Sequence, residues 1–331
     1  MSSRSKLTDP FDREINYLRL SVTDRCNLRC TYCMAEDMTF LSRQQILSLE
    51  ELRDAAAAFV ALGIRKIRLT GGEPTIRRDI LKLVESLASL DGLDELTMTT
   101  NGIKLPAMAQ SLKDAGVSRL NISIDSLRAD RFKALTRVGE LQQVLAGIEA
   151  ARVAKFKKLK LNAVILAGFN DDEVIDLADY AIDRGMDISF IEEMPLGEIS
   201  SHKRAQTQIN SEQIRQQLES KFTLLDSAET TGGPSRYLQV ANSASKIGFI
   251  SPLSNNFCAA CNRVRLTVEG RLLLCLGNEH SADLRHILRS YPGDIERLQS
   301  AILEAIQNKP ERHYFDPQET QILRFMNMTG G

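Results

Sequence analysis

The sequence predicts an α/β fold, a partial (β/α)6 TIM-like barrel followed by a C-terminal extension. Three observations favour it. Short strand-like stretches alternate with helix-like stretches through about the first 220 residues. Nearly every expected strand has one apolar and one polar face. From about residue 240 a hairpin-rich piece and two helices replace this alternation.

The expected strands and helices follow one another in a regular order. Strands are expected at 17–22, 66–70, 95–100, 119–124, 158–165 and 188–193, and helices include 48–62, 78–90, 142–155, 171–184, 282–290 and 295–307. Regular β-α alternation indicates a parallel sheet, and about six units suit an open or partial barrel. A flat doubly wound sheet is the alternative.

The polar faces of the strands predict a polar interior. Leu18 and Leu20, for example, alternate with Arg19. In a parallel sheet with helices on both faces, the strands are apolar at nearly every position. We therefore expect helices on the apolar face only, and a concave interior that contains Arg19, Arg68 and Lys160. The alternative is a polar sheet face that is simply open to solvent.

Composition excludes few classes of protein, but it narrows the expected compartment and partners. The 331 residues include 42 basic and 43 acidic side chains, so net charge suggests neither a nucleic-acid nor a membrane partner. Residues 1–14 lack the features of a signal peptide, and no apolar run of about 18 residues occurs. We expect a cytoplasmic protein, in which the six cysteines are metal ligands or catalytic groups rather than disulfides.

The first cysteine triplet has the spacing C-x3-C-x2-C. Cys26, Cys30 and Cys33 lie in the loop after the first expected strand. Structural zinc takes four ligands, and no further cysteine or histidine is near. Three thiolates on a four-iron cluster leave one iron open to another ligand.

This triplet, with the aromatic Tyr32 before its last cysteine, resembles the signature of the radical-SAM superfamily. The resemblance implies a [4Fe-4S] cluster on three catalytic cysteines, which cleaves S-adenosylmethionine to a 5′-deoxyadenosyl radical. Residues 71–74 resemble the GGEP loop, so Gly72 and Glu73 would bind the cofactor. By the same resemblance, Ser123 would bind its ribose, and Tyr32 and Met194 would contact its adenine.

The second cysteine triplet comprises Cys258, Cys261 and Cys275, with the spacing C-x2-C-x13-C. The spacing suits either an iron-sulfur cluster or zinc, because C-x2-C is also typical of zinc ribbons. Only three cysteines are available, and His280 could supply a fourth ligand.

A hairpin is expected to bring the second triplet together. Residues 263–268 and 271–276 alternate as two strands around a two-residue turn at Glu269-Gly270. This pairing places Cys275 opposite Val264. The return strand would then carry the third thiolate back toward the C-x2-C pair.

Over nearly its whole length the chain resembles the GTP 3′,8-cyclases, lyases of molybdenum cofactor (molybdopterin) biosynthesis. The resemblance rests on the second triplet with residues 262–267 after it, on residues 24–30, 68–74 and 99–102, and on the terminal Gly330-Gly331. It implies a second [4Fe-4S] cluster that binds the guanine of GTP. It assigns GTP contacts to Arg19, Arg68, Thr99, Lys160, Arg263, Val264 and Arg265, with Arg263 and Arg265 also catalytic.

In that family the deoxyadenosyl radical removes the ribose 3′ hydrogen of GTP, and the carbon radical attacks C8. The product is 3′,8-cyclo-7,8-dihydroguanosine triphosphate, made in the first step of the pathway. The cations of the interior and hairpin suit a triphosphate independently of the resemblance. One departure is Glu193, where many relatives have an aromatic residue.

The domain prediction places the radical-SAM barrel at 1–225 and the second cluster with the Gly-Gly tail at 226–331. The resemblance implies that the tail reaches the active site and is needed for turnover. The expected partners are GTP, a reductant such as flavodoxin or ferredoxin, and the next enzyme of the pathway, with the chain a monomer or homodimer.

Two other functions remain open from the sequence. One is a radical-SAM enzyme that modifies peptides, although such relatives usually carry more C-terminal cysteines. The other is a non-catalytic electron carrier or zinc-binding adaptor. An adaptor would not need a polar barrel interior, and an electron carrier would want four cysteines per cluster.

Overall fold

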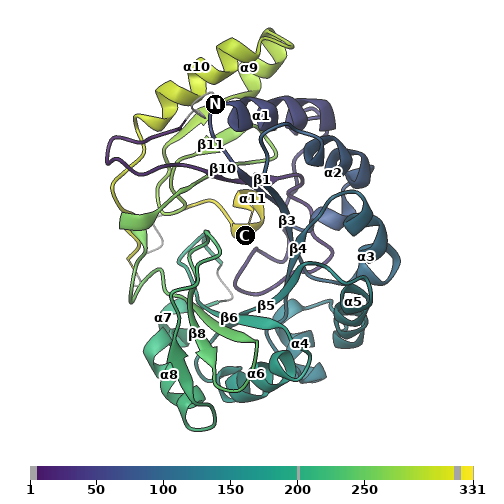
Figure 1. Ribbon diagram of the computed structural model, residues 1–331, viewed down its shortest axis with the longest axis vertical. Helices are drawn as coiled ribbons and strands as arrows, with labels where there is room; N and C mark the ends of the chain where they lie inside the picture. The colour runs from purple at the N-terminus through teal and green to yellow at the C-terminus, as the bar shows by residue number, and fades with distance from the viewer. Residues whose placement is uncertain (1–5, 200–201, 317–321, 331) are drawn as a thin grey trace.

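The computed structural model describes residues 6–199, 202–316 and 322–330, and in these ranges the strands form one twelve-stranded sheet (Figure 1). Its six central strands are parallel and follow the order of the chain. They are β1 (Tyr17–Ser21), β2 (Lys66–Thr70), β3 (Glu95–Thr100), β4 (Arg119–Ser123), β5 (Lys158–Ile165) and β6 (Asp187–Glu192). The six expected strands are therefore confirmed to within a residue at their ends.

Helices cover the outside of this curved sheet, as Figure 1 shows. They are α1 (Leu49–Ala61), α2 (Ile80–Ala88), α3 (Leu105–Asp114), α4 (Ala129–Thr136), α5 (Leu141–Val153), α6 (Val174–Ile182), α7 (Arg204–Thr207) and α8 (Ser211–Glu219). Helix α1 begins at a capping box between Ser48 and Glu51. Helices α3, α4, α7 and α8 were not among the expected helices.

The alternation within the strands separates an apolar outer face from a polar inner face. Leu18 and Ile67 are neighbours in register and are fully buried under the helices. Arg19 and Arg68 are also neighbours in register, and they face the interior. The partial barrel is thus the observed architecture, with helices α1 to α8 on the outer face of the sheet.

The C-terminal part of the chain adds strands to both edges of the six-stranded core. Strand β10 pairs with β1 and β9 pairs with β6, both in parallel. The added strands are β7 (Leu224–Asp226), β8 (Arg236–Val240), β9 (Lys246–Ile250), β10 (Arg263–Leu266), β11 (Arg271–Leu273) and β12 (Ser281–Asp283). The sheet has no break at residue 225, and the domain boundary there stays a prediction.

Three further helices follow these strands. Helices α9 (Arg285–Ser290) and α10 (Ile295–Ile306) lie beside α1 on the outside. Helix α11 (Met326–Thr329) instead lies inside the curl of the sheet, close to the C-terminus (Figure 1). The end of the chain therefore reaches the interior.

The expected register of the β10–β11 hairpin was wrong by one residue. Arg265 pairs with Leu273, and Thr267 N donates to Arg271 O over 2.9 Å. The loop therefore has three residues, 268–270, instead of two. Gly270 takes the left-handed conformation, with φ of 84°, which closes such a loop. In this register Cys275 does not lie opposite Val264.

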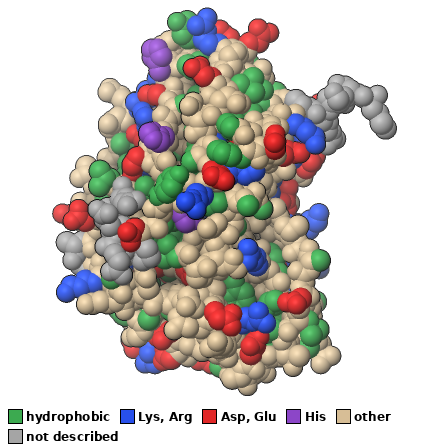
Figure 2. Space-filling model, turned by 90° about the vertical axis from the view of Figure 1, so that its left-hand side faces the viewer, with side chains coloured by type: hydrophobic (Ala, Val, Ile, Leu, Met, Phe, Trp, Pro, Cys, Tyr) green, Lys and Arg blue, Asp and Glu red, His purple; other side chains and the backbone are tan. Residues whose placement is uncertain are grey.

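The face of the molecule drawn in Figure 2 shows no dominant charge. Figure 2 shows basic and acidic side chains interspersed over one face of the molecule. Among the helices of the described residues, none combines the length and the apolar character needed to cross a membrane.

Candidate active site

Two adjoining cavities lie inside the barrel, and each is lined by one cysteine triplet. The first, here called the acidic cavity, is lined by the cysteine loop after β1 and by the ends of the following strands. The second, here called the basic cavity, is lined by the inner face of the sheet and the β10–β11 hairpin. Both are lined by Asn162, Ile191, Met194 and Met326, so these residues mark their common boundary.

The first triplet lies on a single compact loop. Cys33 N donates to Cys30 O over 3.0 Å, which folds the loop back on itself. Burial raises the pKa of Cys26 to about 11 and, with the nearby Cys26 thiol, that of Cys33 to about 12. Three partly buried thiols with raised pKa values form thiolates poorly by themselves, but a bound cluster stabilises thiolates. The donor set therefore fits an iron-sulfur cluster.

Two glycines let the loop after β2 pack closely against the cysteine loop. A Cβ atom on Gly71 would lie 2.4 Å from Thr23 O, and one on Gly72 would lie 2.2 Å from Arg25 O. Only glycine fits at such distances. Gly72 also lines the acidic cavity, so its backbone is available to a ligand.

Glu73 connects the loops that follow β2 and β3. One carboxylate oxygen accepts from Thr100 Oγ1 over 2.7 Å, and the other accepts from Asn101 N over 2.7 Å. The first oxygen also accepts from the backbone and hydroxyl of Thr75. Glu73 lines the cavity as predicted, but these protein donors already engage both of its oxygens.

Tyr32 and Asp125 form one wall of the acidic cavity. The Tyr32 hydroxyl donates to Asp125 Oδ2 over 2.7 Å, and Val164 N donates to Oδ1 over 2.8 Å. Burial raises the pKa of Asp125 to about 6, and burial together with the Asp125 charge raises that of Tyr32 well above its usual value. Ser123 lines the same cavity. Asp125 was not among the predicted site residues; its place two residues after Ser123, on the polar face of this strand, was the available signal.

The charged residues of the acidic cavity are carboxylates. Glu73 and Asp125 line it, and no lysine or arginine is among its described lining residues. Thr99, predicted to contact GTP, lies here, where its hydroxyl accepts from Arg68 over 3.3 Å. A cavity of this kind favours a ligand with positive charge.

The basic cavity has the opposite character. Its described lining includes six cations and no aspartate or glutamate; the cations are Arg19, Lys66, Arg68, Lys160, Arg263 and Arg265. Val264 lines it as well. Five of these cations were predicted to face the interior or lie on the hairpin, and Lys66 was not singled out. Its place in the strand, two residues before Arg68, was the available signal.

Tyrosine hydroxyls pair with two of these cations. Arg68 Nε donates to Tyr17 OH over 2.6 Å, and Lys160 Nζ donates to Tyr237 OH over 3.1 Å. Burial alone would raise the pKa of Tyr17, but Arg68, Arg19 and Lys66 bring it down to about 7. The pKa of Arg265 falls well below its usual value because of burial and the neighbouring arginines. The cations thus repel one another, and a bound anion would relieve this repulsion.

The second triplet lies beside cations from distant parts of the chain. Cys258 begins the short helix η3 (Cys258–Ala260), and its carbonyl accepts from Arg13 over 2.9 Å. Although burial acts to raise it, Lys309 and Arg263 lower the pKa of Cys261. These cations stabilise thiolates, as a metal-binding triplet requires.

The identity of a metal at the second triplet depends on more than these thiols. His280 is exposed and does not line the cavity, whereas His313 does. Among the described residues, no three cysteine, histidine, aspartate or glutamate side chains are arranged to hold a single metal ion. Burial raises the pKa of Cys275, with contributions from the Cys261 and Cys258 thiols, so the three lie within electrostatic range of one another.

The C-terminal tail enters the interior between the two cavities. Met326 N donates to Cys33 O over 3.3 Å, and Asn327 Nδ2 donates to Asp24 O over 2.9 Å. Gly330 O accepts from Arg265 over 2.6 Å and from Arg19 Nε over 3.2 Å. The tail therefore touches the cysteine loop at one end and the cations at the other. Gly331 lies outside the described residues.

Glu193 has a packing role that an aromatic residue could not take. It accepts from His202 over 2.7 Å, from Arg204 over 3.0 Å and from Thr207 over 3.1 Å. These bonds fix the loop after β6, on which Met194 lies between the two cavities.

Comparisons with known proteins agree with this geometry. Residues 20–181 match the family described as Radical SAM superfamily, and residues 186–315 match the family described as Molybdenum Cofactor Synthesis C. The chain is 63% identical over 327 residues to a GTP 3′,8-cyclase of Pseudomonas entomophila (strain L48), and 62% identical to one of Pseudomonas putida (strain W619). Each alignment covers 98% of both chains.

A solved structure supports the fold at much lower identity. Streptococcus suis SuiB bound to S-adenosylmethionine superposes with a TM-score of 0.59 at 14% identity. The superposition covers 96% of this chain and 78% of SuiB.

Proposed function

The chain belongs to the GTP 3′,8-cyclase family of radical-SAM enzymes, and from this premise we propose that S-adenosylmethionine binds in the acidic cavity and GTP in the basic cavity. The enzyme cyclises GTP in the first step of molybdenum cofactor biosynthesis. One observation supports this division of the site above all others. The charged lining residues of one cavity are carboxylates and those of the other are cations, which matches the positive sulfonium of S-adenosylmethionine and the negative triphosphate of GTP.

In the acidic cavity, Cys26, Cys30 and Cys33 would hold a [4Fe-4S] cluster. When bound, the cluster and S-adenosylmethionine supply the 5′-deoxyadenosyl radical. The backbone at Gly72 would approach the methionine part of the cofactor, and the buried carboxylates would favour its positive sulfonium. Tyr32, held by Asp125, would form part of the adenine site together with Met194 and Ser123.

In the basic cavity, the six cations would bind the triphosphate. Arg68 lies between Tyr17 and Thr99, and Arg19 is its neighbour in register, so their positions are set by the sheet. The guanine would lie toward the second triplet, with Arg263 and Arg265 beside it. The ribose would then lie at the common boundary of the cavities, facing the radical source.

The tail would complete this boundary. Gly330 O already accepts from Arg19 and Arg265, and both are cations that we assign to GTP. Its carbonyl would direct the two guanidinium groups before substrate enters. We expect the terminal glycines to be needed for cyclisation for this reason.

A second [4Fe-4S] cluster at Cys258, Cys261 and Cys275 is part of the proposal, and zinc is the alternative. Iron and acid-labile sulfide, measured after anaerobic reconstitution, should fall by about half in Cys275→Ala relative to the wild-type protein. Full activity of a native protein that carries zinc at this triplet would contradict the cluster.

The proposal also covers the reductant, the destination of the product and the assembly. Reduced flavodoxin or ferredoxin would supply the electron, and the next enzyme of the pathway would receive the product. A cytoplasmic monomer or homodimer is the expected form.

The function is tested with the reconstituted protein, S-adenosylmethionine, dithionite and one nucleoside triphosphate at a time. GTP should give the cyclised nucleotide and 5′-deoxyadenosine together, whereas ATP should give no cyclised product. Deoxyadenosine formation without consumption of GTP would support the assignment as a radical-SAM enzyme but contradict GTP as its substrate.

A further inference from the structure

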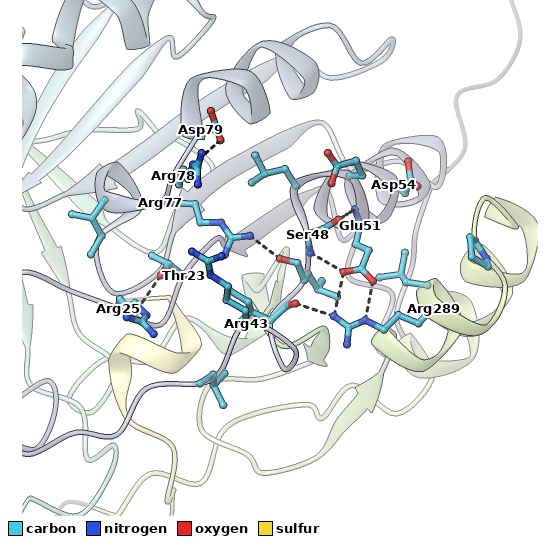
Figure 3. Close-up of a pocket in the computed structure, with 18 residues that line it drawn as sticks. Thr23, Arg25, Arg43, Ser48, Glu51, Asp54, Arg77, Arg78, Asp79 and Arg289 are labelled. Atoms are coloured by element: carbon cyan, nitrogen blue, oxygen red, sulfur yellow. Dashed lines mark hydrogen bonds and ion pairs between the residues drawn. The ribbon is translucent and has the colours of Figure 1, made fainter.

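A third hollow lies on the outside of the barrel, behind the first cysteine triplet. We call it the outer groove; it has a volume of about 910 Å³. It is formed by the segment 41–51, by the residues after β2 and by the end of α9. Figure 3 shows its lining side chains. No part of the mechanism proposed above uses it.

Consecutive residues of the cysteine loop line the outer groove and the acidic cavity. Arg25 lines the groove, while the next residue, Cys26, lines the cavity. Arg25 O also accepts from Glu73 N over 2.8 Å, which fixes this segment against the loop after β2. A molecule seated in the groove is therefore close to the first cluster's ligands without entering the active site.

The two sides of the groove differ in charge. On the side of Thr23, Figure 3 shows Arg25, Arg43, Arg77 and Arg78. On the other side, Glu51 accepts from Arg289 over 2.9 Å, Asp54 lies 3.3 Å from Arg53, and Glu50 is a further acidic lining residue. On the basic side itself, Asp79 lies 3.5 Å from Arg78 (Figure 3).

Two arginines on the basic side are not neutralised by an acidic side chain of the described residues. Within the described residues, no acidic side chain forms an ion pair with Arg25 or Arg43, and both are exposed. Arg77 donates to Leu47 O over 2.8 Å. Burial lowers the pKa of Arg77, the charges of Asp24 and Glu50 oppose this lowering, and the like charge of Arg43 adds to it. Arg25 instead lies over the ring of Phe40, at 5.8 Å. Exposed arginines beside an aromatic ring are typical of protein interfaces.

We infer that the basic side of the outer groove is the docking surface for an acidic one-electron donor protein that reduces the first cluster. The inference deepens the proposed function, because each turnover requires an electron at that cluster. Complementary charge accelerates such encounters, and electron-transfer complexes bury little surface, so a shallow charged groove is sufficient. One electron passes from the reduced donor to the cluster, and the donor leaves oxidised by one electron.

The test compares Arg43→Glu with Arg236→Glu, which reverses the charge of an exposed arginine on β8, at the other end of the sheet. A flavodoxin of net negative charge serves as the probe. Its affinity for the reconstituted protein, measured anaerobically by calorimetry at low salt, should fall about tenfold or more in Arg43→Glu and stay near wild-type in Arg236→Glu. Added salt should weaken wild-type binding strongly.

Measurements of turnover distinguish a failure of this docking surface from a failure of the proposed function. Arg43→Glu should keep wild-type cyclisation with dithionite and lose it with the reduced flavodoxin. Equal flavodoxin affinity in Arg43→Glu and wild-type, or an equal loss in Arg236→Glu, would overturn the docking surface. Absence of cyclised product from the wild-type protein with dithionite would instead count against the proposed function.

Discussion

The acidic and basic cavities each hold three cysteines, yet their surroundings are arranged in opposite ways. Around the first triplet, burial and neighbouring thiols raise the thiol pKa values, and the lining charges are carboxylates. Around the second triplet, Lys309 and Arg263 lower the pKa of Cys261, although burial raises that of Cys275, and the lining charges are cations. Two cysteine triplets in one chain can therefore serve different tasks, because the neighbouring charges favour a different ligand at each site.

The largest expected difference between the cavities is in the products of two cysteine variants. Cys30→Ala removes a ligand of the radical-generating cluster, so it should abolish both deoxyadenosine formation and cyclisation. Cys275→Ala leaves the first cluster's ligands complete. It should keep some uncoupled deoxyadenosine formation but make no cyclised nucleotide, because placement of the ribose depends on holding the base.

Both products are measured by chromatography after anaerobic reconstitution. Added zinc should not restore Cys275→Ala. Wild-type cyclisation in that variant would remove the distinction between the two triplets.

The next effect tests the charge of the basic cavity. Arg68 is 5% exposed and bonds to Tyr17 and Thr99, so Arg68→Ala should weaken GTP binding by about 2–3 kcal/mol. Affinity for S-adenosylmethionine should change little, because no lysine or arginine is among the described lining residues of the acidic cavity. Anaerobic calorimetry measures both affinities, with Arg236→Ala as the surface control. Unchanged GTP affinity would contradict the placement of GTP.

A smaller effect tests the tail at the boundary of the cavities. Gly330 has φ of 75°, and a Cβ atom there would lie 2.2 Å from Thr70 Oγ1. Gly330→Ala should displace the carbonyl from Arg19 and Arg265 and reduce cyclisation by about tenfold to a hundredfold.

Gly293→Ala is the matched control for the tail. Gly293 has φ of 79°, but nothing lies within 4 Å of a Cβ atom there. It carries the same backbone strain without the clash. Equal turnover of the two variants would mean that the position of the tail does not matter.

The smallest effect compares two tyrosines. The pKa of Tyr17, in the basic cavity, is lowered to about 7, whereas that of Tyr32, in the acidic cavity, is raised well above its usual value. Below pH 7 Tyr17 is neutral, and above it the phenolate neutralises the cations and repels the triphosphate. GTP affinity should therefore fall severalfold as the pH rises through about 7, and this fall should be absent in Tyr17→Phe.

Ultraviolet absorbance of phenolate provides an independent reading. The difference between wild-type and Tyr17→Phe should show one group that titrates near pH 7. The difference between wild-type and Tyr32→Phe should show none in this range. A titration of Tyr17 near its ordinary pKa of 10 would mean that the cations do not act on it as the geometry implies.

Much of the fold and part of the candidate site followed from local patterns. Strand alternation predicted the six parallel strands and the inward direction of Arg19, Arg68 and Lys160, because side chains alternate strictly along a strand. Cysteine spacing predicted both triplets, because thiols that share a loop or hairpin stay close in any fold. Helices α3 and α4 escaped prediction although α2 and α6 have similar lengths, because the sequences of α3 and α4 are less apolar.

What the tertiary structure alone decided concerns groups from distant parts of the chain. The one-residue shift of the hairpin depends on the conformation of Gly270, which packs against Arg285. Arg13 and Lys309 approach the second triplet from opposite ends of the chain, which no local spacing encodes.

By itself, the sequence determined the family, the two triplets and the β-α order of the barrel. The opposite charges of the two cavities depend on the curl of the sheet, which belongs to the tertiary structure. The curl gathered Lys66, Arg68 and Arg265 into one cavity and left Glu73 and Asp125 in the other. A chain whose net charge is near zero can hold such separated charges because burial, which weakens screening, makes each cavity respond to its own lining and not to the total.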